Sequence, residues 1–296
     1  MKIYKSLLAS MLVLGVLILA IPACQKFDRP ELVIIPDPLP PAYNALKSYW
    51  QFENNTMDEG ESKLSATAVG LTYAAGVSGQ AVKIGAGGYL LLKAVGDSVK
   101  FPNGFIGLPA DTLRNLGSFT LSFWMNGAGP GTAGAQGLFS ISNKTEFWGN
   151  LDLFLENWDN ASDKSEAFLK VHMFNAGVAT GNGEEWNELK IPGIFNKWSH
   201  IAVTYDGNTS EFTLYANGTA TSINKKKLGG GTYGKIKFNN FNGMVLGSYQ
   251  FQTTPTLTNH GPETWAKSFD GSLDQFRLYN RALSATEITD LFTTKK

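Results

Sequence analysis

The sequence contains a single cysteine, Cys24, and only three histidines among its 296 residues. One cysteine excludes an internal disulfide, and it also excludes a metal site built from several thiolates. Charges are few and balanced, with 25 Lys and Arg against 25 Asp and Glu, so nothing in the composition points to nucleic-acid binding. The glycine-rich stretches at 127–137 and 229–231 lack a Gly-Lys-Ser/Thr element, which excludes a phosphate-binding loop there.

The first residues have the three parts of an export signal. Lys2 and Lys5 precede an apolar run over 7–20, which is shorter than the roughly 20 residues of a membrane-spanning helix. The following Ile21-Pro22-Ala23-Cys24 resembles the bacterial lipobox, in which cleavage precedes the cysteine and its sulfur receives a diacylglycerol. We therefore predict a signal peptide over 1–23 and a lipid anchor at Cys24; an uncleaved anchor helix is the alternative.

Residues 24–43 form the predicted linker between the lipidated cysteine and a folded domain. Four prolines crowd into 36–41, and proline at this density favours an extended polyproline II spacer of ~3 Å per residue. The charged residues just after Cys24 resemble the export signal of surface lipoproteins in Bacteroidota. This resemblance implies an outer-membrane lipoprotein exposed at the cell surface, with display in the periplasm as the alternative.

From residue 44 onward the hydrophobic pattern has a period of two. Alternating segments at 48–53, 119–126 and 198–205 are rich in aromatic and β-branched residues, as half-buried antiparallel strands are. Asp206-Gly207 and Asn217-Gly218 supply the positive φ angles that tight hairpin turns need. The sequence therefore predicts an all-β fold, a β-sandwich or jelly roll of two sheets.

A short helix is predicted at the end of the chain. Ser284 and Glu287 have the spacing of a capping box, and Leu283 and Ile288 stand at the positions of a hydrophobic staple. Ile288, Leu291 and Phe292 then share one face, so this helix is expected to pack against the sandwich.

The run over 269–288, Phe-Asp-Gly-Ser-Leu-Asp-Gln-Phe-Arg-Leu-Tyr-Asn-Arg-Ala-Leu-Ser-Ala-Thr-Glu-Ile, resembles the closing signature of bacterial laminin-G-like domains. These domains belong to the concanavalin A-like lectin/glucanase superfamily. The segments 48–53, 79–84, 119–124 and 198–207 resemble further landmarks of that family, in the same order. The resemblance implies one domain over 44–296, folded as a jelly-roll sandwich of two antiparallel sheets.

A hydrolytic site is not predicted. Glycosidases of this fold carry Glu-x-Asp-x-Glu or Glu-x-Asp-x-x-Glu on one strand, whereas the nearest segment here offers only Asp152 and Glu156. Two residues four positions apart on a strand, such as Asp152 and Glu156, have Cα atoms about 13 Å apart. This is beyond the separation of about 5 to 9.5 Å that glycosidase carboxylates use. His172 and His200 fall at alternating strand positions, where a side chain on a strand face is expected rather than a base.

The resemblance also implies a structural calcium ion. The acidic residues that match by position are Asp58, in the segment 54–60, and Asp274, in the closing signature. Calcium binds six to eight oxygens, which carboxylates, amides and carbonyls could supply here. The alternative is a solvated acidic turn, because the usual Asp-x-Ser-Gly run is replaced by Asp-Glu-Gly-Glu-Ser at 58–62.

Tryptophan residues are the remaining functional signal. Trp50, Trp124 and Trp198 lie in alternating segments and match core positions of the family. The other tryptophans stand in polar, turn-rich surroundings and are candidate ligand-binding residues: Trp148, Trp158, Trp186 and Trp265. An exposed indole covers the apolar face of a sugar ring, while neighbouring amides and carboxylates bind its hydroxyls. Packing beneath a loop is the alternative for each ring.

These features together predict a non-catalytic, monomeric surface lipoprotein whose lectin-like domain binds a poly- or oligosaccharide. A protein-interaction or adhesion module is the first alternative, and an exposed apolar patch without a groove would distinguish it. A glycoside hydrolase is the second.

Overall fold

The computed structural model describes residues 44–64, 66–93, 99–100, 106–107, 113–129, 134–156, 166–178, 181 and 183–295. The predicted signal peptide, the lipid anchor at Cys24 and the proline-rich linker lie outside the described residues, as does Trp158. Within the described ranges, no helix has the length and apolar character needed to cross a membrane.

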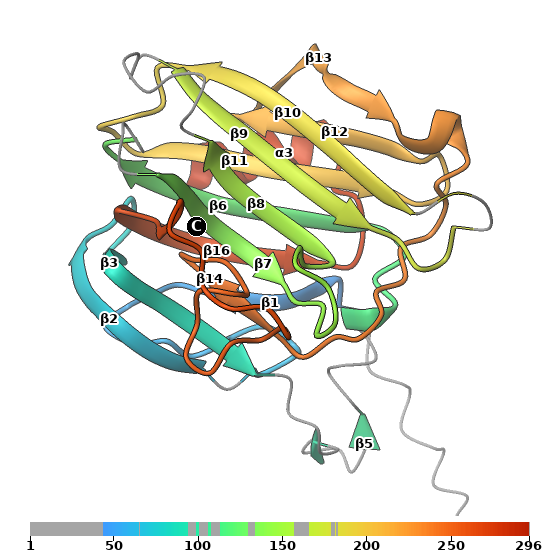
Figure 1. Ribbon diagram of the computed structural model, residues 1–296. Coiled ribbons are helices and arrows are strands. Elements are labelled where there is room, and N and C mark those ends of the chain that lie inside the picture. Colours follow the sequence, from blue (N-terminus) through green and yellow to red (C-terminus); the bar gives the residue numbers. More distant parts are fainter. Residues whose placement is uncertain are drawn as a thin grey trace, which may run out of the picture. The chain divides into compact units, whose positions relative to one another are not determined.

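The architecture is built mainly from antiparallel strands (Figure 1). The strands are β1 (Leu46–Trp50), β2 (Ala66–Ala75), β3 (Gln80–Lys93), β4 (Val99–Lys100), β5 (Ile106–Gly107), β6 (Phe119–Gly127), β7 (Ala135–Ile141), β8 (Leu151–Glu156), β9 (Glu166–Phe174), β10 (Glu184–Pro192), β11 (Ser199–Asp206), β12 (Glu211–Ala216), β13 (Thr219–Lys227), β14 (Gly243–Leu246), β15 (Ala266–Ser268) and β16 (Gly271–Tyr279). A 3₁₀ turn, η1 (Leu228–Gly231), follows β13, and a helix, α3 (Ala285–Thr294), follows β16.

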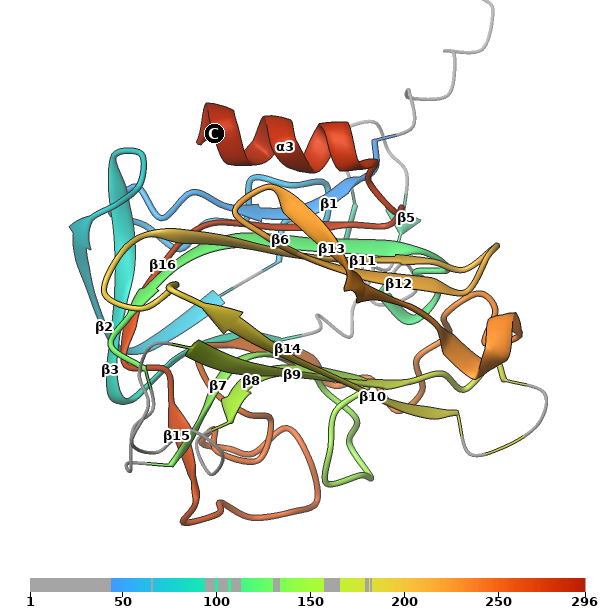
Figure 2. The ribbon, with the colours of Figure 1, turned by 90° about the horizontal axis from the view of Figure 1, so that it is seen from above.

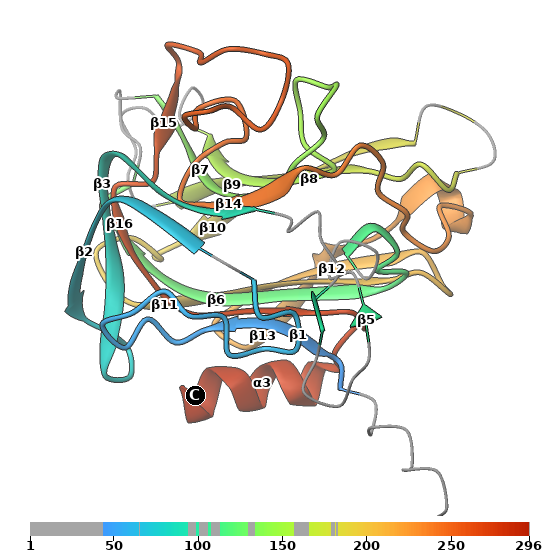
Figure 3. The ribbon, with the colours of Figure 1, turned by 90° about the horizontal axis from the view of Figure 1, so that it is seen from below.

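One sheet curls on itself to make both layers of the sandwich. Its strands run in the order β10-β9-β8-β7-β14-β3-β16-β6-β11-β12-β13, with β1 paired to β16, β2 to β3 and β15 to β7. Figures 2 and 3 show β7–β10 and β14 in one layer and β1, β6, β11, β12 and β13 in the other. The predicted jelly-roll sandwich is therefore confirmed.

The core lies between the layers, where the apolar residues of each alternating pattern meet. Trp50 and Phe123 are fully buried and pack against Phe276, whose ring centroid lies 6.0 Å from that of Trp50 and 5.3 Å from that of Phe123. Trp124 is also buried, whereas Trp198 is only partly buried. The expectation of a core position is thus met at Trp50, whereas Trp124 is buried on the other face of its sheet, against Phe292, and Trp198 is buried only in part.

Helix α3 lies on the outside of the β6–β11 layer (Figure 2). Its predicted capping box is confirmed, since Ser284 Oγ accepts from the Glu287 amide at 3.3 Å and the Ser284 amide donates to the Glu287 carboxylate at 2.8 Å. Ile288 is buried against the sheet, and the ring of Phe292 stacks on Trp124 at 5.5 Å. The predicted apolar face therefore docks the helix.

Candidate functional site

A row of functional side chains crosses the outer face of the β7–β10 layer. Asp152 on β8, His172 on β9 and Trp186 on β10 are direct partners in the strand register. Because side chains alternate along a strand, the neighbours Leu151 and Leu153 point inward and join the core, which leaves this row on the outer face.

Hydrogen bonds fix the row in one arrangement. His172 Nδ1 lies 3.1 Å from Asp152 Oδ2, and His172 Nε2 lies 3.3 Å from Glu184 Oε1. The Trp186 indole N–H donates to the same Glu184 oxygen at 3.1 Å, and the Gly149 amide donates to Asp152 at 2.7 Å. Asp152 and His172 are almost fully buried, so they position the more exposed Glu184 and the Trp186 ring.

Trp148 and Trp265 come from distant loops to join Trp186. The centroid of the Trp148 ring lies 5.1 Å from that of Trp186, edge to face, and 6.0 Å from that of Trp265. Trp148 and Trp186 are half-buried, while 39% of Trp265 is exposed. Three of the four tryptophans predicted to bind a ligand are thus brought into one cluster, which we call the outer aromatic cluster.

Further rings support the outer aromatic cluster from below. Phe154 of β8 stacks on Trp148 with centroids 5.4 Å apart, and Phe251 stacks on Phe147 at 4.4 Å. Tyr249 is buried beside Phe154, and its hydroxyl has no hydrogen-bond partner within the described residues. Burial raises the pKa of Tyr249 well above its usual value, so the hydroxyl stays protonated and retains a free donor.

A cavity of about 210 Å³ opens beside these rings. Its lining includes Phe147, Trp148, His172 and Glu184, together with Asn143 and Glu146. The cavity therefore combines aromatic walls with amide, imidazole and carboxylate groups, which are the groups that hold polyhydroxylated ligands.

The side chains weighed as catalytic groups have structural partners. Asp152 binds the Gly149 amide and His172, as described above, and Glu156 lies 3.6 Å from the ammonium of Lys170. His200 is buried beneath α3, with Nε2 2.9 Å from Ser122 Oγ, so this pair faces no solvent. Burial and the charge of Arg277 lower the pKa of His200 to about 3.

Asp58 and Asp274 each close a loop through backbone amides. Both carboxylates are buried, and each accepts three hydrogen bonds of 2.7 to 3.3 Å. The donors are Tyr49, Gly60 and Leu64 for Asp58, and Val77, Ser78 and Gln275 for Asp274.

The Asp58 and Asp274 carboxylates share no donor, and the described residues contain no group of three or more His, Cys, Asp or Glu able to hold a metal. A calcium ion held jointly by these two side chains does not fit this arrangement, because each set of oxygens already faces N–H hydrogens. Calcium dependence stays a prediction.

Several members of the cluster could not be predicted from the sequence. Phe147 directly precedes Trp148 and Glu184 stands two residues before Trp186, and this closeness in sequence was the available signal. The sequence predicts His172 only as a strand-face residue, and its contact with Trp186 depends on the register of β9 and β10. Tyr249 and Phe251 carried no signal, because they lie in a segment without periodicity.

Residues 97–289 match the family model described as the concanavalin A-like lectin/glucanases superfamily, a laminin G family. The sequence has no match among curated proteins.

Solved structures similar to this chain include two binding domains of botulinum neurotoxins. The binding domain of botulinum neurotoxin DC, in complex with SialylT, is 14% identical with a TM-score of 0.54, over 85% of this chain and 51% of that chain. The ligand-binding domain of serotype D, in complex with N-acetylneuraminic acid, is 13% identical with a TM-score of 0.53, over 85% and 51%. This chain therefore spans about half the length of the neurotoxin domains it matches.

Domain 4 of AbnA, a GH43 extracellular arabinanase from Geobacillus stearothermophilus in complex with arabinotriose, is also similar. It is 18% identical with a TM-score of 0.50, over 83% of this chain and 97% of that domain. At these identities the similarity shows a shared fold.

Proposed function

The chain belongs to the concanavalin A-like lectin/glucanases superfamily, and from the site on its β7–β10 layer we propose that it is a non-catalytic carbohydrate-binding domain. The outer aromatic cluster binds the ligand: Trp265 and Trp186 cover the apolar face of a sugar ring, and the exposed Glu184, which His172 positions, binds its hydroxyls.

The observation that carries this proposal is the convergence of Trp148, Trp186 and Trp265 in one cluster from three separate segments of the chain, beside a cavity that Trp148 lines. A hydrophobic core needs no polar groups. Here, however, Glu184 accepts from the Trp186 indole N–H and lies 3.3 Å from His172 Nε2, beside the rings of the cluster. Aromatic rings beside oriented polar groups are the chemistry by which proteins bind sugars in water.

Two similar structures support the choice of ligand class. Their titles describe a neurotoxin ligand-binding domain with N-acetylneuraminic acid and an arabinanase domain with arabinotriose. We extend this property to the present chain as part of the proposal, together with the predicted lipid anchor at Cys24 and display at the cell surface.

The test measures binding by the full chain on a glycan array, followed by calorimetric titration of the best ligand. We expect Trp265→Ala and Trp186→Ala to weaken binding at least about 10-fold, since loss of a stacking ring removes on the order of 1.4 kcal/mol or more. Tyr73→Ala is the matched control, because Tyr73 is an aromatic residue on β2 with a similar exposure of 37%. A blank array, or an equal loss in the control, would refute the proposal.

The non-catalytic part of the proposal has its own test. The wild-type chain should release no reducing sugar from β-glucans or arabinans. Turnover that disappears in Asp152→Asn would show instead that the Asp152–His172 pair belongs to a hydrolase.

A second candidate function rests on strand β2. This strand pairs only with β3 among the described strands, carries no charged residue, and exposes 37% of both Val69 and Tyr73. An uncharged, exposed edge strand can add a strand from a protein partner. If β2 is such a surface, Tyr73→Lys should abolish protein binding or self-association in sedimentation experiments while glycan binding stays unchanged.

A further inference from the structure

The two end strands of the curled sheet face each other across the open side of the sandwich. β10 ends one layer and β13 ends the other, and the backbones of these two strands are not paired. Side chains join them instead: Lys226 Nζ donates to Glu185 at 3.0 Å and to the Trp186 carbonyl at 3.3 Å, and Glu185 accepts from the Gly229 amide at 2.9 Å.

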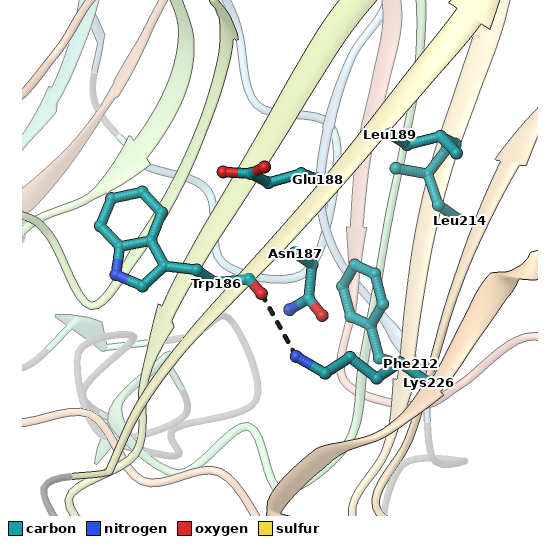
Figure 4. A pocket seen from close by; sticks show the side chains of 7 residues that line it. All are labelled: Trp186, Asn187, Glu188, Leu189, Phe212, Leu214 and Lys226. Atoms are coloured by element: carbon teal, nitrogen blue, oxygen red, sulfur yellow. Dashed lines mark hydrogen bonds between the residues drawn. The ribbon is translucent and has the colours of Figure 1, made fainter.

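A cavity of about 300 Å³ lies beneath this bridge (Figure 4). Leu189 of β10 and Phe212 and Leu214 of β12 form its apolar walls, and Lys226 stands at its rim. Trp186 is also among its lining residues, but the Trp186 ring points away from the cavity in Figure 4, whereas Asn187 points into it.

Asn187 is a buried amide without a partner. Only 8% of this residue is exposed, and neither its Nδ2 nor its Oδ1 has a hydrogen-bond partner within the described part of the chain. Its register partner Val171 belongs to the hydrophobic core, which confirms that Asn187 faces inward. Leaving both a donor and an acceptor buried and unpaired destabilises a protein, so such a group in a cavity calls for a ligand or a water.

We propose that the cavity between β10 and β12–β13 is a second binding site, which accepts one neutral sugar unit. A sugar hydroxyl both donates and accepts, so adjacent hydroxyls satisfy both ends of the Asn187 carboxamide. The apolar walls match the nonpolar face of a sugar ring, and the volume is at the small end of ligand sites, which suits a single unit. The Lys226 charge is already paired with Glu185, which favours a neutral ligand over an anion.

The first measurement is the thermal unfolding of the free protein. Asn187→Leu removes the unpaired amide and should raise the melting temperature by about 2 to 8 °C. Asn150→Leu is the matched control, because the Asn150 amide is also buried but donates to the Ser142 and Asn239 carbonyls at 2.6 and 2.8 Å. That substitution should lower the melting temperature. An unchanged or lower value for Asn187→Leu would mean that the amide is already satisfied and would overturn the proposal.

The second measurement follows the ¹⁵N side-chain amide signal of Asn187 by NMR, assigned by its absence in Asn187→Leu. Methyl glycosides of glucose, galactose, mannose and arabinose are titrated separately, with acetamide as a carboxamide probe. We expect a saturable shift with at least one glycoside in the wild type and in Trp265→Ala. A shift that persists in Trp265→Ala shows that the sugar binds here and not at the outer aromatic cluster. The result therefore stands even if the outer aromatic cluster binds no sugar. No shift with any glycoside, or a shift with acetamide alone, would overturn the assignment to a sugar.

Discussion

Replacement of His200 should change how the stability of the domain depends on pH. The His200 side chain lies on β11, is 1% exposed, and is covered by the rings of Trp124 and Phe292 at 5.3 and 6.1 Å. Its Nε2 contacts Ser122, and its Nδ1 has no partner within the described residues. Burial and the nearby charge of Arg277 lower the pKa of His200 from 6.5 to about 3, so the folded protein holds this imidazole neutral.

The sign and size of the effect follow from proton linkage. Between pH 6.5 and 3 the unfolded chain binds a proton at His200 and the folded chain does not, so stability falls as the pH falls. At 1.36 kcal/mol per pH unit, His200 alone lowers the free energy of unfolding by about 3 kcal/mol between pH 7 and pH 4.

Asp274 acts in the opposite direction. Burial raises its pKa from 3.8 to about 6, despite the three amides that bind it, so the folded state takes up the proton first as the pH falls. The contribution of Asp274 to the free energy of unfolding therefore rises by about 2 kcal/mol as the pH falls from 7 to 4. Because the two effects largely cancel, the wild-type chain should show only a small part of either.

The assay is urea denaturation of the wild type, His200→Gln and Asp274→Asn at pH 7 and pH 4. On going from pH 7 to pH 4, the free energy of unfolding of His200→Gln should rise by about 3 kcal/mol relative to that of the wild type. That of Asp274→Asn should fall by about 2 kcal/mol relative to the wild type. A difference between His200→Gln and the wild type that does not change with pH would refute this account of His200.

Two further predictions concern the outer aromatic cluster and helix α3. Trp148→Ala should lower the free energy of unfolding by about 2 to 4 kcal/mol, because this ring contacts those of Phe154 and Trp186. Trp265→Ala should lower it by less than about 1 kcal/mol, because this ring is more exposed. Equal losses in urea denaturation would contradict the assigned roles. Ser284→Ala should cost about 1 kcal/mol through loss of the cap, and the exposed neighbouring Thr286→Ala, measured in the same way, should cost clearly less.

The features of the fold that depend on local sequence could be predicted. Alternation at 119–126 and 198–205 corresponds to β6 and β11, and the capping box of Ser284 and Glu287 joins residues three positions apart. The pairing order of the curled sheet could not be predicted, because β3 and β16 are adjacent in space but far apart in sequence.

The candidate site was predictable only as separate residues. The polar surroundings of Trp148, Trp186 and Trp265 marked each of them, but their contact depends on the register of β8–β10 and on the loop before β15. For Asp58 and Asp274, the sequence shows a carboxylate without showing its donors. The structure shows these donors to be backbone amides.

The position of β10 explains why two candidate sites gather around one strand. A strand inside the sheet has neighbours on both edges, and its inner face is covered by the opposite layer. β10 ends the sheet, so the cavity beneath it stays open toward β13 while the outer face carries the aromatic cluster. Because successive side chains point to opposite faces, Trp186 and Asn187 serve one site each. A one-residue shift of β10 against β9 would therefore exchange the two side chains and disrupt both sites at once.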